Sequence, residues 1–175
     1  MARVGRSILT RQSHMSHIRA ATALDAPQIC AVHLSAIREV CASSYTQEQV
    51  QTWLEGKRPE RYLHAIAQGF FFVAVVREAV VGFAELDSRT AEICAVYVSP
   101  TCLRQGIGTA LLRHLERAAL AQNIPRLHLR ASLNSIPFYA AHGYILERMA
   151  TTRLKHRIDL QCGIMSKAFP ALPET

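Results

Sequence analysis

The stretch from Ile93 to Thr109 constrains the fold more than any other part of the chain. It reads as an apolar strand, a turn opened by Pro100, and two glycines, Gly106 and Gly108, at the start of a long helix. Free backbone N–H groups and the positive end of the helix dipole meet at a helix N-terminus, and glycine lets an anion approach the backbone closely. The sequence therefore predicts a phosphate-binding turn between this strand and this helix.

Composition excludes several classes of protein. The chain has 175 residues and 50% hydrophobic content, which suits one folded domain with a substantial core. Its longest apolar run, residues 69–76, is far shorter than the roughly 20 residues that span a bilayer, so we expect no membrane partner. The net charge of +7 comes without a dense basic run or an aromatic-rich RNA-binding strand. We therefore expect an anionic small molecule as partner rather than nucleic acid.

The five cysteines (30, 41, 94, 102 and 162) form no C-x-x-C pair, which argues against a zinc site and a disulfide framework. We expect each cysteine to be a small buried apolar residue, and we expect a cytoplasmic protein without a metal. Cys94 could carry a covalent intermediate in a ping-pong route, but a cysteine in mid-strand is more often part of the core. Residues 1–17 carry arginines and serines without acids, so we expect a disordered tail there and a short second tail at 170–175.

The spacing of apolar residues changes from a helical to a strand period near residue 70. Before it, residues 18–21 predict a short strand, and Thr22 with Asp25 and Thr46 with Gln49 form two capping patterns that each precede a helix. Beyond it, residues 70–76, 80–86 and 91–98 predict an antiparallel meander. The other predicted elements are a helix at 108–122, a strand at 127–131, a short helix at 137–142 and a closing hairpin of 144–154 with 158–168.

These elements predict an α+β domain over residues 18–169, with a mostly antiparallel mixed sheet of six or seven strands flanked by helices. Because a helix separates the strand at 91–98 from the strand at 127–131, these two should run parallel. We expect this one parallel pair to splay where the phosphate turn emerges, since open sheets bind ligands at such points.

Three kinds of phosphate site compete for the glycine turn. A P-loop requires a lysine after its glycines, and none follows here. A dinucleotide fold requires a third glycine and an acid at the end of the next strand, and both are missing.

The third reading comes from resemblance. Val98 and Pro100, the run from Arg104 to Leu112, and the downstream segments around Asn134, 137–139 and 142–144 resemble the GNAT superfamily of acyl-CoA-dependent N-acyltransferases. The order of predicted elements resembles that fold over nearly the whole chain. Residues 38–53 are similar to a bacterial subgroup of generic N-acetyltransferases.

The resemblance implies acetyl-CoA as co-substrate. Its pantetheine arm would pair like an extra strand with Val96, Tyr97 and Val98, where a splayed edge offers spare N–H and C=O groups. Ser132 or Asn134 would hold the same arm, although Asn134 could equally be the N-cap of the next helix. The family usually has Gln or Arg at the position of Leu103, so we expect a somewhat lower affinity for acetyl-CoA. The pyrophosphate would lie on the backbone amides of Arg104, Gln105, Gly106, Ile107, Gly108 and Thr109.

The resemblance also assigns catalytic roles. Tyr139 would be the proton donor to the thioester sulfur, with plain core packing as the alternative. Glu92, fourteen residues before Gly106, matches an acid found in some members and is the candidate base. Glu85, one strand earlier, or no protein base at all, are the alternatives. His33, His114, His128 and His142 show no ligand spacing and are expected to be core or solvated.

The reaction implied is direct transfer of the acetyl group from acetyl-CoA to a primary amine. The acceptor would lie between residues 45–53 and the sheet, and is a small amine, an antibiotic or a peptide N-terminus. A non-catalytic acyl-CoA-binding regulatory module is the alternative function. The sequence does not decide between a monomer and a homodimer.

Overall fold

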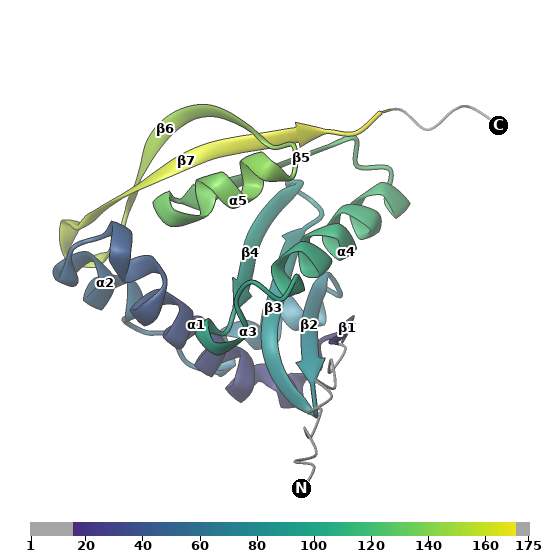
Figure 1. The fold of residues 1–175 in the computed structure, drawn as a ribbon, viewed down its shortest axis with the longest axis horizontal. Coiled ribbons are helices and arrows are strands. Elements are labelled where there is room, and N and C mark those ends of the chain that lie inside the picture. The colour runs from purple at the N-terminus through teal and green to yellow at the C-terminus, as the bar shows by residue number, and fades with distance from the viewer. Residues whose placement is uncertain (1–15, 171–175) are drawn as a thin grey trace, which may run out of the picture.

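The computed structural model describes residues 16–170. Residues 1–15 of the tail expected at 1–17, and residues 171–175 of the tail expected at 170–175, therefore lie outside the described residues. His17, which the sequence assigned to the N-terminal tail, is the first residue of a strand. Within the described range, seven strands form one sheet in the order β1-β2-β3-β4-β5-β7-β6 (Figure 1). The strands are β1 His17–Ala20, β2 Phe71–Val76, β3 Ala79–Asp87, β4 Glu92–Val98, β5 Arg126–Ser132, β6 Ile145–Arg153 and β7 Asp159–Ala168.

Five α-helices connect these strands in the described part of the chain. The two predicted capping patterns both form, at the turn before α1 and at α2. At the second, Thr46 Oγ1 accepts from the Gln49 backbone N–H (3.2 Å) and Gln49 Oε1 accepts from the Thr46 N–H (2.9 Å). This satisfies two N–H groups that a helix start otherwise leaves free. The helices are α1 Ala26–Glu39, α2 Gln47–Leu54, α3 Glu60–Ala67, α4 Ile107–Ala121 and α5 Ile136–Ala141.

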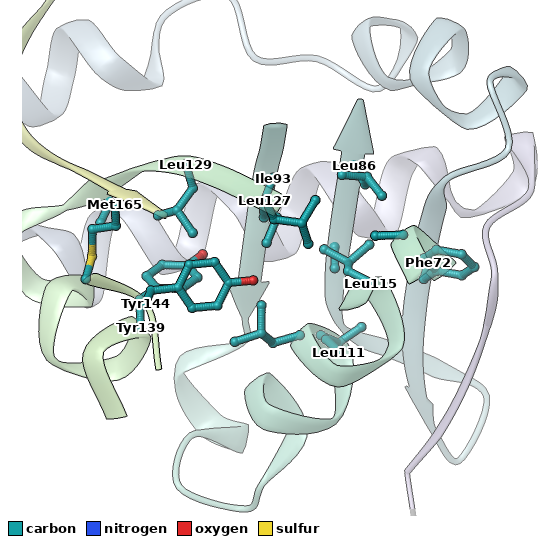
Figure 2. Packing of buried hydrophobic residues seen from close by; sticks show 14 of the residues in the cluster. Phe72, Leu86, Ile93, Leu111, Leu115, Leu127, Leu129, Tyr139, Tyr144 and Met165 are labelled. Atoms are coloured by element: carbon teal, nitrogen blue, oxygen red, sulfur yellow. The ribbon is translucent and has the colours of Figure 1, made fainter. Parts of the chain in front are cut away.

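The helices cover both faces of the sheet and create two cores. On one face α1 and α3 pack on the rings of Phe71 and Phe83, which stack 5.5 Å apart. On the other face α4 and α5 bury Leu111, Leu115 and Tyr139 against β4 and β5 (Figure 2). Neighbouring strands of the sheet pair antiparallel, with one exception: β4 and β5 pair parallel to each other. The predicted α+β architecture with one parallel pair is confirmed.

The closing hairpin also forms, and its placement could not be read from the sequence. β7 lies between β5 and β6, so the last strand of the chain is internal and β6 is at the edge. β5 pairs with β7 along its whole length, from Arg126↔Ala168 to Ser132↔Cys162. Because β7 pairs with β5 along one edge, β5 can diverge from β4 and still have one of its two edges fully hydrogen-bonded.

An ion pair fastens β1 to the start of α1. The Arg19 guanidinium donates to both carboxylate oxygens of Asp25 at 2.7 Å, and the backbone N–H of Thr22 donates to Asp25 Oδ2 at 2.7 Å. These hydrogen bonds favour the charged carboxylate, of which only 7% is exposed, and lower the pKa of Asp25 from 3.8 to about 2. The ion pair therefore stabilises the fold at neutral pH.

Replacing Asp25 by Asn should lower the free energy of unfolding by about 2 kcal/mol, because it leaves the half-buried Arg19 without its charged acceptor. The loss should be full above pH 3.8, the ordinary pKa of the carboxyl, and should shrink as the pH falls toward about 2, where the native carboxylate is itself protonated. Urea titrations at several pH values measure this. Asp87→Asn, which breaks an exposed pair with Arg89, is the matched control and should change little. Equal effects of both variants would contradict the role of Asp25.

Candidate functional site

The site begins where β4 and β5 separate. They pair only at Glu92↔His128 and Ile93↔Leu129. Beyond Ile93, β4 stays paired with β3 as far as Val98, while its other edge has no partner strand in the described part of the chain (Figure 1). The backbone groups on that edge are therefore free to bind an extended ligand.

The glycine turn lies at the end of this open edge. Gly106 is the N-cap of α4 and has the left-handed φ of +79°, and Arg104 before it has φ +60°. A positive φ is rare for residues other than glycine, so the backbone at Arg104 is strained. Such strain persists where the surrounding structure imposes it. The helix starts at Ile107 without a side-chain cap, so its first N–H groups face outward and can bind an anion.

A cavity of about 900 Å³ extends from this turn along β4 to α1 and α2. Its size suits one cofactor-sized ligand. Every cofactor-binding residue predicted from the sequence lines it except Gln105, whose side chain donates instead to Thr101 O at 3.4 Å. Leu103, the departure from the family pattern, is also at the wall, beside Arg104.

Asn134 has a polar group that the protein leaves unsatisfied. Its Oδ1 is buried and accepts no hydrogen bond from any residue of the described range. The N-cap position of α5 is Ser135, so the alternative role of Asn134 as cap of that helix does not hold. A buried amide oxygen without a donor is costly, and an amide N–H of a ligand in the cavity would satisfy it. The hydroxyl of Ser132, by contrast, donates to Ser135 Oγ at 3.0 Å, and the backbone oxygen of Ser132 accepts from Ser135 Oγ at 2.9 Å.

Tyr139 comes from α5 and lines the same cavity. Its ring lies beside Tyr144 at a centroid distance of 5.6 Å, and Figure 2 shows both rings in the cluster with Leu111 and Leu129. Burial raises the pKa of Tyr139, so its hydroxyl stays protonated at neutral pH and can act as a proton donor.

The two candidate bases have different surroundings. Glu92 does not line the large cavity, and its carboxylate faces Arg130, with Oε1 3.8 Å from Nε. Glu85 lies opposite Ala95 in the β3–β4 register and lines a smaller cavity next to the large one. Burial, and then the carboxylates of Asp87 and Glu92, raise the pKa of Glu85.

Cys94 is not a core residue, contrary to the expectation from the sequence. The β3–β4 register passes from Glu85↔Ala95 to Leu86↔Ile93, so Cys94 is bulged out and exposed at the cavity. Desolvation and then the carboxylate of Glu85 raise the pKa of its thiol to about 11. The thiol is therefore protonated at neutral pH, which disfavours a ping-pong route through this residue.

Sequence reasoning missed three contributors to the site. His142, expected to be solvated or core, does not itself line the cavity but links two residues that do: its Nδ1 lies 2.7 Å from Phe138 O, and its Nε2 lies 3.0 Å from the hydroxyl of Thr109. Lys57 and His33 line the cavity at its far end. The sequence could have indicated His33, because it is a polar residue on the apolar face of a predicted helix. Nothing in the sequence around Lys57, which lies in a loop, indicated a role in the site.

The chain matches the family model described as the acetyltransferase (GNAT) domain over residues 41–158, more than half of its length. It belongs to this GNAT family. Enzymes of the family use acetyl-CoA as co-substrate, so the protein is an acetyl-CoA-dependent acyltransferase. The family match favours this over a non-catalytic acyl-CoA-binding module.

Solved structures support the same fold. A GCN5-related N-acetyltransferase from Rhodopseudomonas palustris has a TM-score of 0.82 and 25% identity, covering 88% of this chain and 96% of its own. The PaiA N-acetyltransferase of Thermoplasma acidophilum, in complex with coenzyme A, has a TM-score of 0.74 and 22% identity, covering 89% and 99%. YncA of Salmonella typhimurium, with acetyl-CoA, has a TM-score of 0.63 and 18% identity, covering 92% and 98%. No curated protein sequence matches the chain.

Acetyl-CoA fits the residues that this chain presents. The outward N–H groups at the start of α4 would bind the pyrophosphate, the open edge of β4 would bind the pantetheine arm, and the Oδ1 of Asn134 would accept from one of its amides. Over the described range, no helix is long and apolar enough to cross a membrane, and no three metal-ligating side chains come together.

Gly106→Ala should weaken coenzyme A binding about fivefold or more, because an alanine at φ +79° costs about 1 kcal/mol and shifts the turn. Gly69→Ala is the matched control, since Gly69 has φ +88°, lies outside the cavity, and like Gly106 leaves open space for a Cβ. Both variants should lose similar thermal stability, and only Gly106→Ala should raise the Kd for coenzyme A in calorimetry. A parallel loss of affinity in Gly69→Ala would show that the turn has no special role.

Proposed function

We propose that the enzyme transfers the acetyl group directly from acetyl-CoA to a primary amine, in a complex that holds both substrates. The observation that carries this proposal is that one cavity combines the open edge of β4 and the glycine turn with a second region under α1 and α2. Tyr45 and Trp53 line that region, opposite β4, which agrees with the acceptor position expected from the sequence. A small amine, an antibiotic or a peptide N-terminus would enter there.

Tyr45 gives this second region a fixed wall. Its hydroxyl donates to Gln161 O and accepts from the backbone N–H of Leu133, both at 2.8 Å. The tyrosine thus joins the segment between α1 and α2 to β7 and to the turn before α5. A rigid wall lowers the entropic cost of orienting an acceptor toward the thioester.

In the proposed reaction the amine nitrogen attacks the thioester carbonyl, an N–C bond forms and the C–S bond breaks. A backbone N–H along Val96–Val98 would stabilise the charge that develops on the carbonyl oxygen. A carboxylate would take one proton of the ammonium before attack, and the hydroxyl of Tyr139 would protonate the departing sulfur. The second proton that the nitrogen loses would return to the Tyr139 phenolate. Glu85 and Glu92 are the candidate bases; the position of Glu85 beside Ala95, which lines the large cavity, supports Glu85.

Tyr139→Phe should lower kcat about a hundredfold and leave the KM for acetyl-CoA unchanged, because it removes the proton donor and nothing else. The hydroxyl makes no hydrogen bond within residues 16–170, so Tm should not fall. Release of free thiol from acetyl-CoA with an amine panel measures kcat. If the variant keeps full turnover at all pH values, Tyr139 is a packing residue only.

Substituting each acid separately identifies the base. A base must be deprotonated to act, so kcat/KM should fall as the pH drops through its pKa, and for Glu85 that pKa is raised above 4.5. We expect Glu85→Gln to abolish this acidic limb of the pH profile and Glu92→Gln to keep it. The reverse outcome would assign the base to Glu92, and an intact limb in both variants would mean that no protein carboxylate acts as base.

A further inference from the structure

A second, smaller cavity lies next to the acetyl-CoA cavity, on the face covered by α1 and α3. It has a volume of about 170 Å³, and His33 and Lys57 line both cavities. With about 30 Å³ per water molecule, it has room for a few small polar groups and not for a second large ligand. It is therefore an annex to the region in which the acceptor would lie.

Two cations face the annex without a counterion. Lys57 is half-buried, and no carboxylate pairs with it in the part of the chain that the structure describes. Burial, and then the charge of Arg61, lower the pKa of Lys57. Within residues 16–170 the Arg61 guanidinium makes one hydrogen bond, a long one of 3.5 Å from Nη1 to Gly56 O. An anion between the two side chains would relieve their mutual repulsion.

His33 adds a neutral donor at the boundary of the two cavities. Its Nε2 is buried and has no partner among residues 16–170, while its Nδ1 lies 3.0 Å from the hydroxyl of Tyr62. Burial, and then Lys57, lower the pKa of His33 to about 3, so the ring is neutral. Burial raises the pKa of Tyr62, so its O–H can donate to Nδ1 and leave Nε2–H as a free donor. The Tyr97 ring, 4.2 Å away, holds the imidazole in place.

Glu85 supplies the one carboxylate that lines the annex in the described chain. It is opposite Ala95, so it faces the end of the annex that is nearest to β4 and to the proposed position of the thioester. The annex thus presents negative charge next to β4 and positive charge at Lys57 and Arg61. This arrangement is complementary to a small molecule that carries an ammonium and an anion a few bonds apart.

We propose that the acceptor is a free amino acid, whose carboxylate binds Lys57 and Arg61 with the help of His33 Nε2–H, and whose amine lies at Glu85. The inference rests on the proposed acetylation of an amine and adds the chemical class of that amine. One ammonium proton passes to Glu85, the N–C bond forms as the C–S bond breaks, Tyr139 protonates the sulfur, and the second proton that the nitrogen loses returns to the Tyr139 phenolate. The products are an N-acetyl amino acid and coenzyme A.

The test compares the standard L-amino acids with their α-carboxamides and with the amines obtained by removing the carboxylate, using thiol release from acetyl-CoA. At least one amino acid should have a kcat/KM ten to a hundred times that of both counterparts, the range expected for a hydrogen bond to a charged group. Lys57→Met should abolish this preference by raising the KM for the amino acid far more than the KM for its carboxamide. Lys57→Arg should restore part of it.

Arg58→Met is the matched control, because Arg58 is the adjacent cation but is 73% exposed and does not line the annex. It should keep the preference for the carboxylate. The inference is overturned if carboxamides or simple amines are turned over as well as the amino acids, or if Lys57→Met keeps the preference; amine acetylation would then stand. If no compound in any of the three sets releases thiol, the proposed amine acetylation fails, and this inference fails with it.

Discussion

The separation of β4 from β5 is the constraint on which the rest of the structure depends. Two parallel strands that share only two paired positions leave one edge of β4 with unpaired backbone groups inside the molecule. Such groups are costly when they are buried without partners. The fold compensates on one side by pairing β5 with β7, and on the other side acetyl-CoA, as we propose, would complete the edge as a further strand. The binding site is thus a gap that the sheet cannot close by itself.

The two faces of the sheet take different parts of the reaction. The face with α4 and α5 provides the glycine turn, Asn134 and Tyr139, to which we assign binding of the acyl donor and protonation of its sulfur. The opposite face, under α1 and α3, provides the charged side chains that we assign to the acceptor. Direct transfer requires that the donor and acceptor meet at one point. The open edge of β4 is accessible from both faces and satisfies that requirement.

Burial influences which groups in the site carry a charge. Desolvation keeps Tyr139 and Cys94 protonated and His33 neutral, so the charged groups that remain at the acceptor end are Lys57, Arg61 and the carboxylates near β4. In a partly buried cavity each of these charges acts more strongly than it would at the surface. Specificity for the acceptor would therefore depend on few side chains, and single substitutions can separate their roles.

The local signals in the sequence were sufficient for most of the fold. Capping at Thr46 and Gln49, the change of period near residue 70 and the helix after Gly106 depend on neighbours within a few residues, and each appears in the structure. The motif also predicted residues that, apart from Gln105, line one cavity, because most of them are consecutive in the chain. Cys94 was misassigned, since a β-bulge depends on the register with the neighbouring strand.

The sequence by itself thus determined the elements and the family, and it predicts the turn that binds acetyl-CoA; all of these are encoded in continuous segments. Only the tertiary structure decided that β7 inserts beside β5, and that Glu85 lies across from Ala95. It alone brought Lys57 and His33 to one cavity wall, from a loop and a helix 24 positions apart in the chain. The physical reason is that these groups are joined by packing and strand pairing, which act across distant parts of the chain and leave no periodic pattern within it.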